Sequence, residues 1–198
     1  MTRPPKPPVT TVARAAWPTY GADNARLRAV AAPGLRPPFR RLWTFHGRHL
    51  LEFPPVVGYG SVFEEAFDGR LYSIDPATGR VRWRYTSHRC GWSSPAVADH
   101  LLFATFIGNH ECHATQAGGE LVALSPDTGR IRWRRAIGPS ESSPLVAGGT
   151  LYVADQSGYV YAFAARTGGR GLKPQLLAGP PPDRVRGGCA QAWPWVET

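Results

Sequence analysis

The segment IDPATGRVRWRY, from Ile74 to Tyr85, returns about fifty residues later as LSPDTGRIRWRR, from Leu124 to Arg135. Both copies place a short turn sequence between stretches that resemble strands. In the first copy, the Asp75 side chain can accept backbone N–H groups at the start of the turn, and Gly79 can adopt the positive φ that closes it. The segment therefore predicts two β-strands joined by a tight turn, used at least twice.

Aligning the chain with itself reveals three related units. They span about residues 53–85, 93–136 and 142–169, and the second is lengthened by the insert NHECHATQAG. A period of about forty residues is typical of the blades of a β-propeller. Marker residues recur at three places in the units: Pro55, Pro95 and Pro144; Gly69, Gly119 and Gly158; Gly79, Gly129 and Gly168.

Each unit contains the parts of a four-stranded antiparallel sheet. In the second unit the expected strands are SPAVA, LLFAT, ELVALS and RIRWRRA. In the last strand of the first unit, Val81, Trp83 and Tyr85 alternate with arginines, which predicts one apolar and one charged face. The indoles of Trp83 and Trp133 are large enough to fill the wedge between neighbouring sheets, where each N–H needs an acceptor. We therefore predict an all-β fold of about three propeller blades.

The third unit lacks its last strand, and three blades cannot close a ring, because known propellers have four to eight. The position of Trp83 and Trp133 falls at Leu172, within a stretch without strand alternation. We interpret the chain as a fragment of a larger propeller; the alternative is that it pairs with copies of itself. We divide it into a disordered, Pro-rich N-terminus (1–16), a repeat region (17–169) and an irregular tail (170–198).

Composition narrows the classes of function. The chain has 198 residues, 42% of them hydrophobic, and a formal charge of +9 from 23 Lys and Arg against 14 Asp and Glu. The arginines are spread one or two at a time, which is typical of a solvated face and does not favour nucleic-acid binding. The longest apolar run, Leu101 to Ile107, is too short to span a bilayer.

The start of the chain has no apolar core of the kind that a signal peptide requires. Taken as it stands, the sequence predicts a cytoplasmic protein. With a signal upstream of this start, the prediction becomes a periplasmic or other extracytoplasmic location in a bacterium.

The most reactive side chains gather around the insert. The segment SHRCGW contains His88 and Cys90, and GNHECHA contains His110, Cys112 and His113. Both segments are expected as loops beside the same strand pair. In an oxidising compartment Cys90 and Cys112 can form a disulfide. The alternatives are a zinc or copper site shared by the two loops, or two unpaired cysteines with solvated histidines.

The units resemble the pyrroloquinoline-quinone-like (PQQ-like) β-propeller repeat. LYSIDPATGRVRW, LVALSPDTGRIRW and SSPLVAGGTLYVADQSGYVYAFAARTG are similar to its pattern of a strand ending Ala-Leu-Asp, then x-x-Thr-Gly, then a strand with Trp. Residues 17–30 and 41–47 resemble the family's N-terminal start, where the first strand completes the outer edge of the last blade. The resemblance implies structural roles for Trp43, Trp83, Trp133, Gly79, Gly129, Gly168, Asp75, Thr78 and Thr128.

The family that the chain resembles includes quinoprotein dehydrogenases and scaffolds of the outer-membrane assembly lipoprotein B type. The dehydrogenases hold PQQ with a tryptophan, often a disulfide between adjacent cysteines, and a calcium or lanthanide ion. This sequence has no adjacent cysteines, and its carboxylates, such as Glu64, Glu65 and Asp155, match no catalytic motif. We therefore expect a non-catalytic envelope scaffold that binds proteins through its loops, without a cofactor. The alternative is a fragment of a PQQ- and calcium-dependent alcohol or glucose dehydrogenase.

Overall fold

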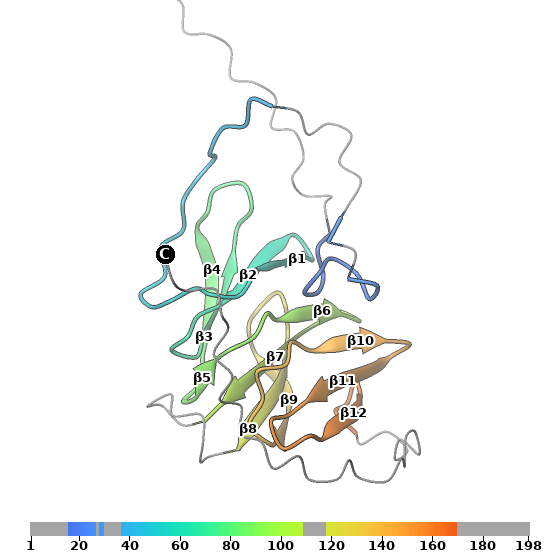
Figure 1. The fold of residues 1–198 in the computed structure, drawn as a ribbon. Coiled ribbons are helices and arrows are strands. Elements are labelled where there is room, and N and C mark those ends of the chain that lie inside the picture. The colour runs from blue at the N-terminus through green and yellow to red at the C-terminus, as the bar shows by residue number, and fades with distance from the viewer. Residues whose placement is uncertain (1–15, 27, 30–36, 109–117, 170–198) are drawn as a thin grey trace, which may run out of the picture.

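A computed structural model describes residues 16–26, 28–29, 37–108 and 118–169. Except for residue 16, the predicted terminal regions 1–16 and 170–198 lie outside this part of the chain. Its twelve strands form three antiparallel sheets, and the described residues contain no helix (Figure 1). The all-β fold of stacked, blade-like sheets is therefore confirmed, and the three sheets do not close a ring.

The first two sheets contain the four strands that each unit predicts, and the second contains one more. The first sheet consists of β1 (Val56–Gly58), β2 (Ser61–Glu65), β3 (Arg70–Ile74) and β4 (Val81–Thr86), paired in that order. The second consists of β5 (Cys90–Gly91), β6 (Ala96–Ala98), β7 (Leu101–Ile107), β8 (Gly119–Leu124) and β9 (Ile131–Ile137). The additional strand, β5, pairs with the end of β7 beyond β6. A sheet of five strands was not predicted.

The third sheet has three strands: β10 (Leu145–Ala147), β11 (Thr150–Ala154) and β12 (Val160–Ala164). No fourth strand pairs with β12 in the part of the chain that the structure describes. The innermost strands β1, β6 and β10 lie beside one another, because β6 contacts both of the others.

The turn between β3 and β4 is built as its sequence predicts. The Asp75 carboxylate accepts the backbone N–H and the hydroxyl of Thr78 at 2.9 and 3.0 Å. The hydrogen bond from Arg82, followed by those from Thr78, lowers the pKa of Asp75 from 3.8 to about 2. In the equivalent turn of the second sheet, the Thr128 hydroxyl accepts a backbone N–H at 3.4 Å. Side-chain acceptors therefore hold both turns.

The alternation predicted for β4 is wrong at Val81. Trp83 lies opposite Ser73, but Val81 lies opposite Ile74, so one extra residue of β4 forms a bulge. A bulge reverses the face on which the preceding side chain lies, and Val81 is 45% exposed. The second sheet repeats the shift at the same place in β9.

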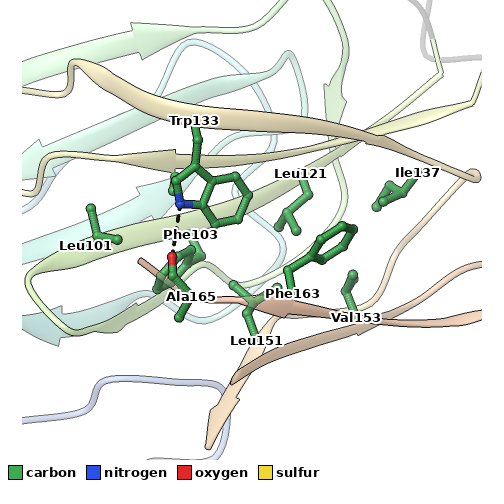
Figure 2. Packing of buried hydrophobic residues seen from close by; sticks show 10 residues of the cluster. Leu101, Phe103, Leu121, Trp133, Ile137, Leu151, Val153, Phe163 and Ala165 are labelled. Atoms are coloured by element: carbon green, nitrogen blue, oxygen red, sulfur yellow. Dashed lines mark hydrogen bonds between the residues drawn. The ribbon is translucent and has the colours of Figure 1, made fainter. Parts of the chain in front are cut away.

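The hydrophobic core lies between neighbouring sheets. Its part between the first and second sheets consists of Val56, Phe63, Leu71, Val97, Leu102, Ala104, Phe106, Val122 and Leu124. In the part between the second and third sheets, Figure 2 shows Trp133 of β9 lying over side chains from both sheets. Its ring centroid is 5.9 Å from that of Phe103 and 6.4 Å from that of Phe163. Each sheet therefore depends on its neighbour for burial.

The repeated tryptophans fasten each sheet to the next. Trp83 donates its indole N–H to the carbonyl of Pro126, in the last turn of the second sheet, at 2.9 Å. Trp133 donates in the same way to Ala165, in the third sheet, at 2.9 Å (Figure 2). Each indole thus combines apolar contact with a satisfied N–H group.

The glycine that ends each of these turns makes room for the indole. Gly79, Gly129 and Gly168 have positive φ angles of 72, 68 and 64°. A Cβ at any of them would lie 2.6–2.8 Å from a carbon atom of a tryptophan ring, closer than real Cβ contacts allow. Glycine is therefore required at each position for two reasons: the backbone has a positive φ, and the tryptophan ring leaves no space for a Cβ atom.

Trp43 takes the same position ahead of the first sheet. Its N–H donates to the carbonyl of Pro76 at 2.8 Å, and its ring lies against Gly79. Two residues later, Phe45 packs edge to face on Tyr72, with ring centroids 5.0 Å apart. The segment around Trp43 therefore lies where the outer strand of a preceding blade would lie, but none of the described strands pairs with it.

The segment that begins at Trp17 lies against the innermost strands of all three sheets. Trp17 exchanges backbone hydrogen bonds with Val57 of the first sheet, both of 2.8 Å. Pro18 accepts the N–H of Val97 of the second sheet at 2.7 Å. The Asn24 side chain donates to a carbonyl of β10 at 3.1 Å. Of the two stretches that resemble the family's N-terminal start, this one therefore lies at the inner edge.

Candidate functional site: the junction loops

The loops that carry the reactive side chains lie together at one edge of the first two sheets. We call them the junction loops: residues 66–69, residues 87–94, and the ends of the insert at 108 and 118. The N–H groups of Ser87 and Gly91 donate to the carbonyls of Gly69 and Phe67 at 2.9 and 3.1 Å. The loop that leads into the second sheet therefore lies directly on the β2–β3 turn of the first.

Arg89 connects this loop to the base of the insert. Its guanidinium donates to the carbonyls of Gly108 and Gly118, the latter at 3.3 Å. Gly108 also donates its N–H to the carbonyl of Gly118 at 3.1 Å. The two ends of the insert are thus held together and held to the first sheet, while residues 109–117 lie outside the described residues.

Cys90 lies in a strand, where the sequence predicts a loop. It pairs with Ile107 in the short ladder between β5 and β7, and its side chain is buried. The structure has Cys90 disulfide-bonded. The other two cysteines, Cys112 and Cys189, are both outside the described residues, so the pairing of Cys90 with Cys112 stays a prediction.

His88 is the member of the predicted histidine set that the structure describes, and its side chain is exposed. His110 and His113 lie outside the described residues. Within residues 16–108 and 118–169, apart from the masked positions, no three His, Cys, Asp or Glu side chains come together as a metal-binding group. A metal site that uses the insert therefore stays a prediction.

Two adjacent glutamates are buried at the end of β2, beside the junction loops. Glu64 and Glu65 are 6% and 3% exposed, and three of their four carboxylate oxygens have no hydrogen-bond partner. Successive residues of a strand point to opposite faces. Glu65 faces β5, because a Cβ at Gly91 would lie 2.6 Å from its Oε1 atom. Glu64 therefore faces the opposite side of the first sheet.

Burial keeps the carboxyl group of Glu64 largely neutral near pH 7 and favours the neutral form of Glu65. It raises the pKa of Glu64 from 4.5 to about 8, because the charged form loses its hydration. Burial likewise raises the pKa of Glu65 well above 4.5, and the charge of Glu64 adds to this. The backbone groups of Trp92 and Ser93 and the hydroxyl of Ser93 oppose the shift, although none makes a hydrogen bond of ordinary geometry to Glu65.

The repeat explains what Glu65 does at this position. The strand registers make Thr105 its equivalent in the second sheet. Thr105 donates its hydroxyl to the carbonyl of Ser142, at the start of the third unit, at 3.0 Å. Ser93 is the equivalent of Ser142 and faces Glu65. A protonated Glu65 has one O–H donor. It can therefore donate a hydrogen bond between the first and second sheets, as Thr105 does between the second and third.

The Ser-Ser-Pro motifs connect all three units near the inner strands. Ser94 donates its hydroxyl to the carbonyl of Pro54 of the first unit at 2.8 Å. Its N–H donates to the hydroxyl of Ser143 of the third unit at 3.0 Å. This role of the serines was not predicted, although their recurrence beside the marker prolines was a signal for it.

The substitution Glu64→Gln is expected to flatten the dependence of stability on pH. A carboxyl whose pKa is raised in the folded state binds protons more tightly there than in the unfolded chain, so stability is greatest below pH 4.5 and decreases as the pH rises toward 8. For Glu64 the decrease between pH 5 and 8 is on the order of 3 kcal/mol. Urea denaturation at several pH values measures it. The exposed Glu52→Gln is the control, and an equally steep loss in Glu64→Gln would show that the carboxyl is not the cause.

The period of forty residues, the stacked antiparallel sheets and the indole fastened to each following turn define a β-propeller repeat protein. The chain belongs to the PQQ-like repeat family described as outer membrane protein assembly factor BamB, whose family model matches residues 68–192. No curated protein matches the chain. Among the described residues, no helix has the length and apolar character needed to cross a membrane.

Solved structures show the same repeat architecture. The quinohemoprotein alcohol dehydrogenase from Comamonas testosteroni is 21% identical and aligns with 79% of this chain and 26% of its own, with a TM-score of 0.64. A europium-containing methanol dehydrogenase is 18% identical over 79% of this chain and 31% of its own, also with a TM-score of 0.64. BamB from Moraxella catarrhalis is 25% identical over 58% of this chain and 34% of its own, with a TM-score of 0.48. The chain thus spans about a third or less of these proteins.

Proposed function

We propose that this chain is a non-catalytic scaffold of the cell envelope that binds other proteins through the junction loops. The observation that carries the proposal is the anchored insert, whose two ends are held by Arg89, in the loop that lies on the first sheet. Loops fixed on a rigid frame are where recognition residues are usually found. Membership of a family described as an outer membrane protein assembly factor supports a role in such assembly and a periplasmic location.

The composition of the junction loops supports protein binding. Phe67 and Trp92 are half-buried, and their ring centroids lie 5.4 Å apart. Asp68, in the same turn, pairs with Arg70 and lies 3.4 Å from the imidazole of His49. Aromatic residues and arginine are enriched in protein interfaces. The loops thus combine apolar area with charge at one edge of the sheets.

Site-specific cross-linking tests this proposal. A photo-cross-linking amino acid at His88, in the junction loops, is expected to capture outer-membrane assembly proteins in cells, and mass spectrometry identifies them. The matched control is His100, also an exposed histidine but in the turn between β6 and β7, near Asp127. Cross-links to assembly proteins of equal yield at both positions, or none at His88, would contradict binding through the junction loops.

The described residues do not fit the PQQ and calcium site of the alternative function, a quinoprotein dehydrogenase. Calcium is held by several oxygen ligands, normally with charged carboxylates among them. Glu64 and Glu65 point to opposite faces of β2, so their carboxyl groups cannot bind one ion together. The dehydrogenase structures are less than 25% identical to this chain in sequence, so the similarity concerns the fold alone. We therefore derive no catalytic step.

A further inference from the structure

Four aromatic rings form a line from the surface of the third sheet into the core between the second and third sheets. Tyr159 immediately precedes β12 and is 65% exposed, whereas Trp133, at the other end of the line, is buried. Between them, Tyr161 and Phe163 lie at alternate positions of β12 and therefore on one face of the strand. Successive ring centroids are 6.5, 6.1 and 6.4 Å apart. Figure 2 shows the inner end of this aromatic line, at Phe163 and Trp133.

Tyr161 is the residue of the aromatic line whose hydroxyl is bonded to a base. It donates to the Asp155 carboxylate at 2.7 Å and accepts the backbone N–H of Gly138 at 3.1 Å. A carboxylate is ionised at neutral pH, and the distance is within the range for direct proton transfer. The repeat does not require this pair, because the strand registers place the apolar residues Val122 and Phe106 at the equivalent positions of the second sheet.

The charged and polar groups around the line favour the loss of an electron at Tyr161 over its loss at Trp133. The Arg135 guanidinium lies 5.9 Å from the ring centroid of Trp133, so it disfavours a positive charge on the indole. The indole N–H donates to the carbonyl of Ala165, which is not a base that can take its proton. At Tyr161, by contrast, the negative charge of Asp155 favours electron loss, and the carboxylate can accept the phenolic proton.

We propose that Tyr161 is the residue at which this chain is oxidised by outer-sphere one-electron oxidants, such as an oxidising metal complex. One electron passes to the oxidant, the O–H bond of Tyr161 breaks, and the proton moves to the Asp155 carboxylate. The products are a neutral tyrosyl radical, a protonated Asp155 and the oxidant reduced by one electron. This inference does not rest on the proposed function.

The aromatic line gives this oxidation a protective role. When Trp133 is the first residue to lose an electron, Tyr161 replaces that electron through the ring of Phe163 and transfers its own proton to Asp155. The indole is thereby restored. Because Trp133 fastens the second sheet to the third, the line keeps a permanent oxidative modification away from the residue that joins the two sheets.

Radical trapping followed by peptide mass spectrometry tests this assignment on the full chain. The oxidant is tris(bipyridine)ruthenium(III), generated by light with a cobalt(III) electron acceptor, and a small nitroso compound traps the radicals as covalent adducts. The internal control is Tyr152 of β11, which is 38% exposed and has no carboxylate bonded to its hydroxyl among the described residues. Tyr161 is less exposed than Tyr152, yet we expect it to carry the larger amount of adduct.

Asp155→Asn separates proton transfer from hydrogen bonding. Asparagine can still accept the hydroxyl of Tyr161 and the backbone N–H groups of the turn, but its amide does not take up the proton. We expect the Tyr161 adduct to decrease by about tenfold or more, since a positioned base typically contributes a factor of about 100 or more. The Tyr152 adduct should stay unchanged, and adducts on Trp133 should increase.

Tyr161→Phe keeps Asp155 in place and removes only the phenolic donor, so it distinguishes the redox role from a structural role of the carboxylate. It is also expected to increase the adducts on Trp133, with a circular dichroism spectrum like that of the wild type. A Tyr161 adduct no larger than that of Tyr152 would overturn the proposal. So would a Tyr161 adduct that Asp155→Asn leaves unchanged, or adducts on Trp133 that neither variant increases.

Discussion

Replacing Trp133 by alanine is expected to lower the free energy of unfolding by about 3–5 kcal/mol. The indole is 8% exposed and lies in the core between the second and third sheets. Its removal leaves a cavity beside Phe103 and Phe163 and leaves the carbonyl of Ala165 without its donor. Domains are typically stable by about 5–15 kcal/mol, so this change removes a large share. Chemical denaturation followed by far-ultraviolet circular dichroism measures the loss.

Two further variants separate the causes of this effect. Trp133→Phe keeps most of the apolar contact but loses the N–H group, and is expected to cost about 1–3 kcal/mol. Arg132→Ala, at the adjacent exposed position, is expected to change stability by less than about 0.5 kcal/mol. If Trp133→Ala were as mild as Arg132→Ala, the indole would not be what holds these sheets together.

The second large effect is expected from Gly129→Ala. Gly129 has a φ of +68°, and a Cβ there would lie 2.6 Å from the ring of Trp83. The substitution therefore combines backbone strain of about 1–2 kcal/mol with displacement of the indole from its docking position. We expect a total loss of about 3 kcal/mol or more, measured by the same denaturation experiment. The tryptophan fluorescence of the whole chain is expected to shift toward that of a more exposed indole.

Gly148→Ala is the matched control for the steric part. Gly148 also has a positive φ, of +57°, but a Cβ there would have no atom within 4 Å. It should therefore show the backbone strain alone, about 1–2 kcal/mol. An equal loss in Gly148→Ala and Gly129→Ala would show that the space beside Trp83 is not limiting.

Much of the architecture could be predicted because its signals are local and repeated. The Asp75 turn and its glycine occupy five successive residues, and the units recur along the chain. The prediction from alternating apolar and charged residues was wrong at Val81, because one extra residue in β4 turns the Val81 side chain to the other face of the sheet. The same bulge in β9 shows that the shift belongs to the repeat.

The candidate site was less predictable, because its properties depend on contacts between separate units. Glutamate is a residue type usually found at the surface, yet burial under neighbouring segments raises the pKa of both Glu64 and Glu65. Arg89 reaches Gly108, which lies nineteen residues later, directly before the insert. The strand at Cys90 exists because the end of β7 offers it a partner. No pattern within either segment encodes these contacts.

The sequence by itself determined that this protein is a chain of antiparallel β-sheets of one repeated kind, because turn chemistry and strand alternation act over a few residues. Tertiary structure decided the rest. It placed Trp83 against Gly129 and Trp133 against Gly168, and it buried the two glutamates. These features depend on which distant surfaces meet, since burial and displaced water are properties of the packed sheets and not of any single segment.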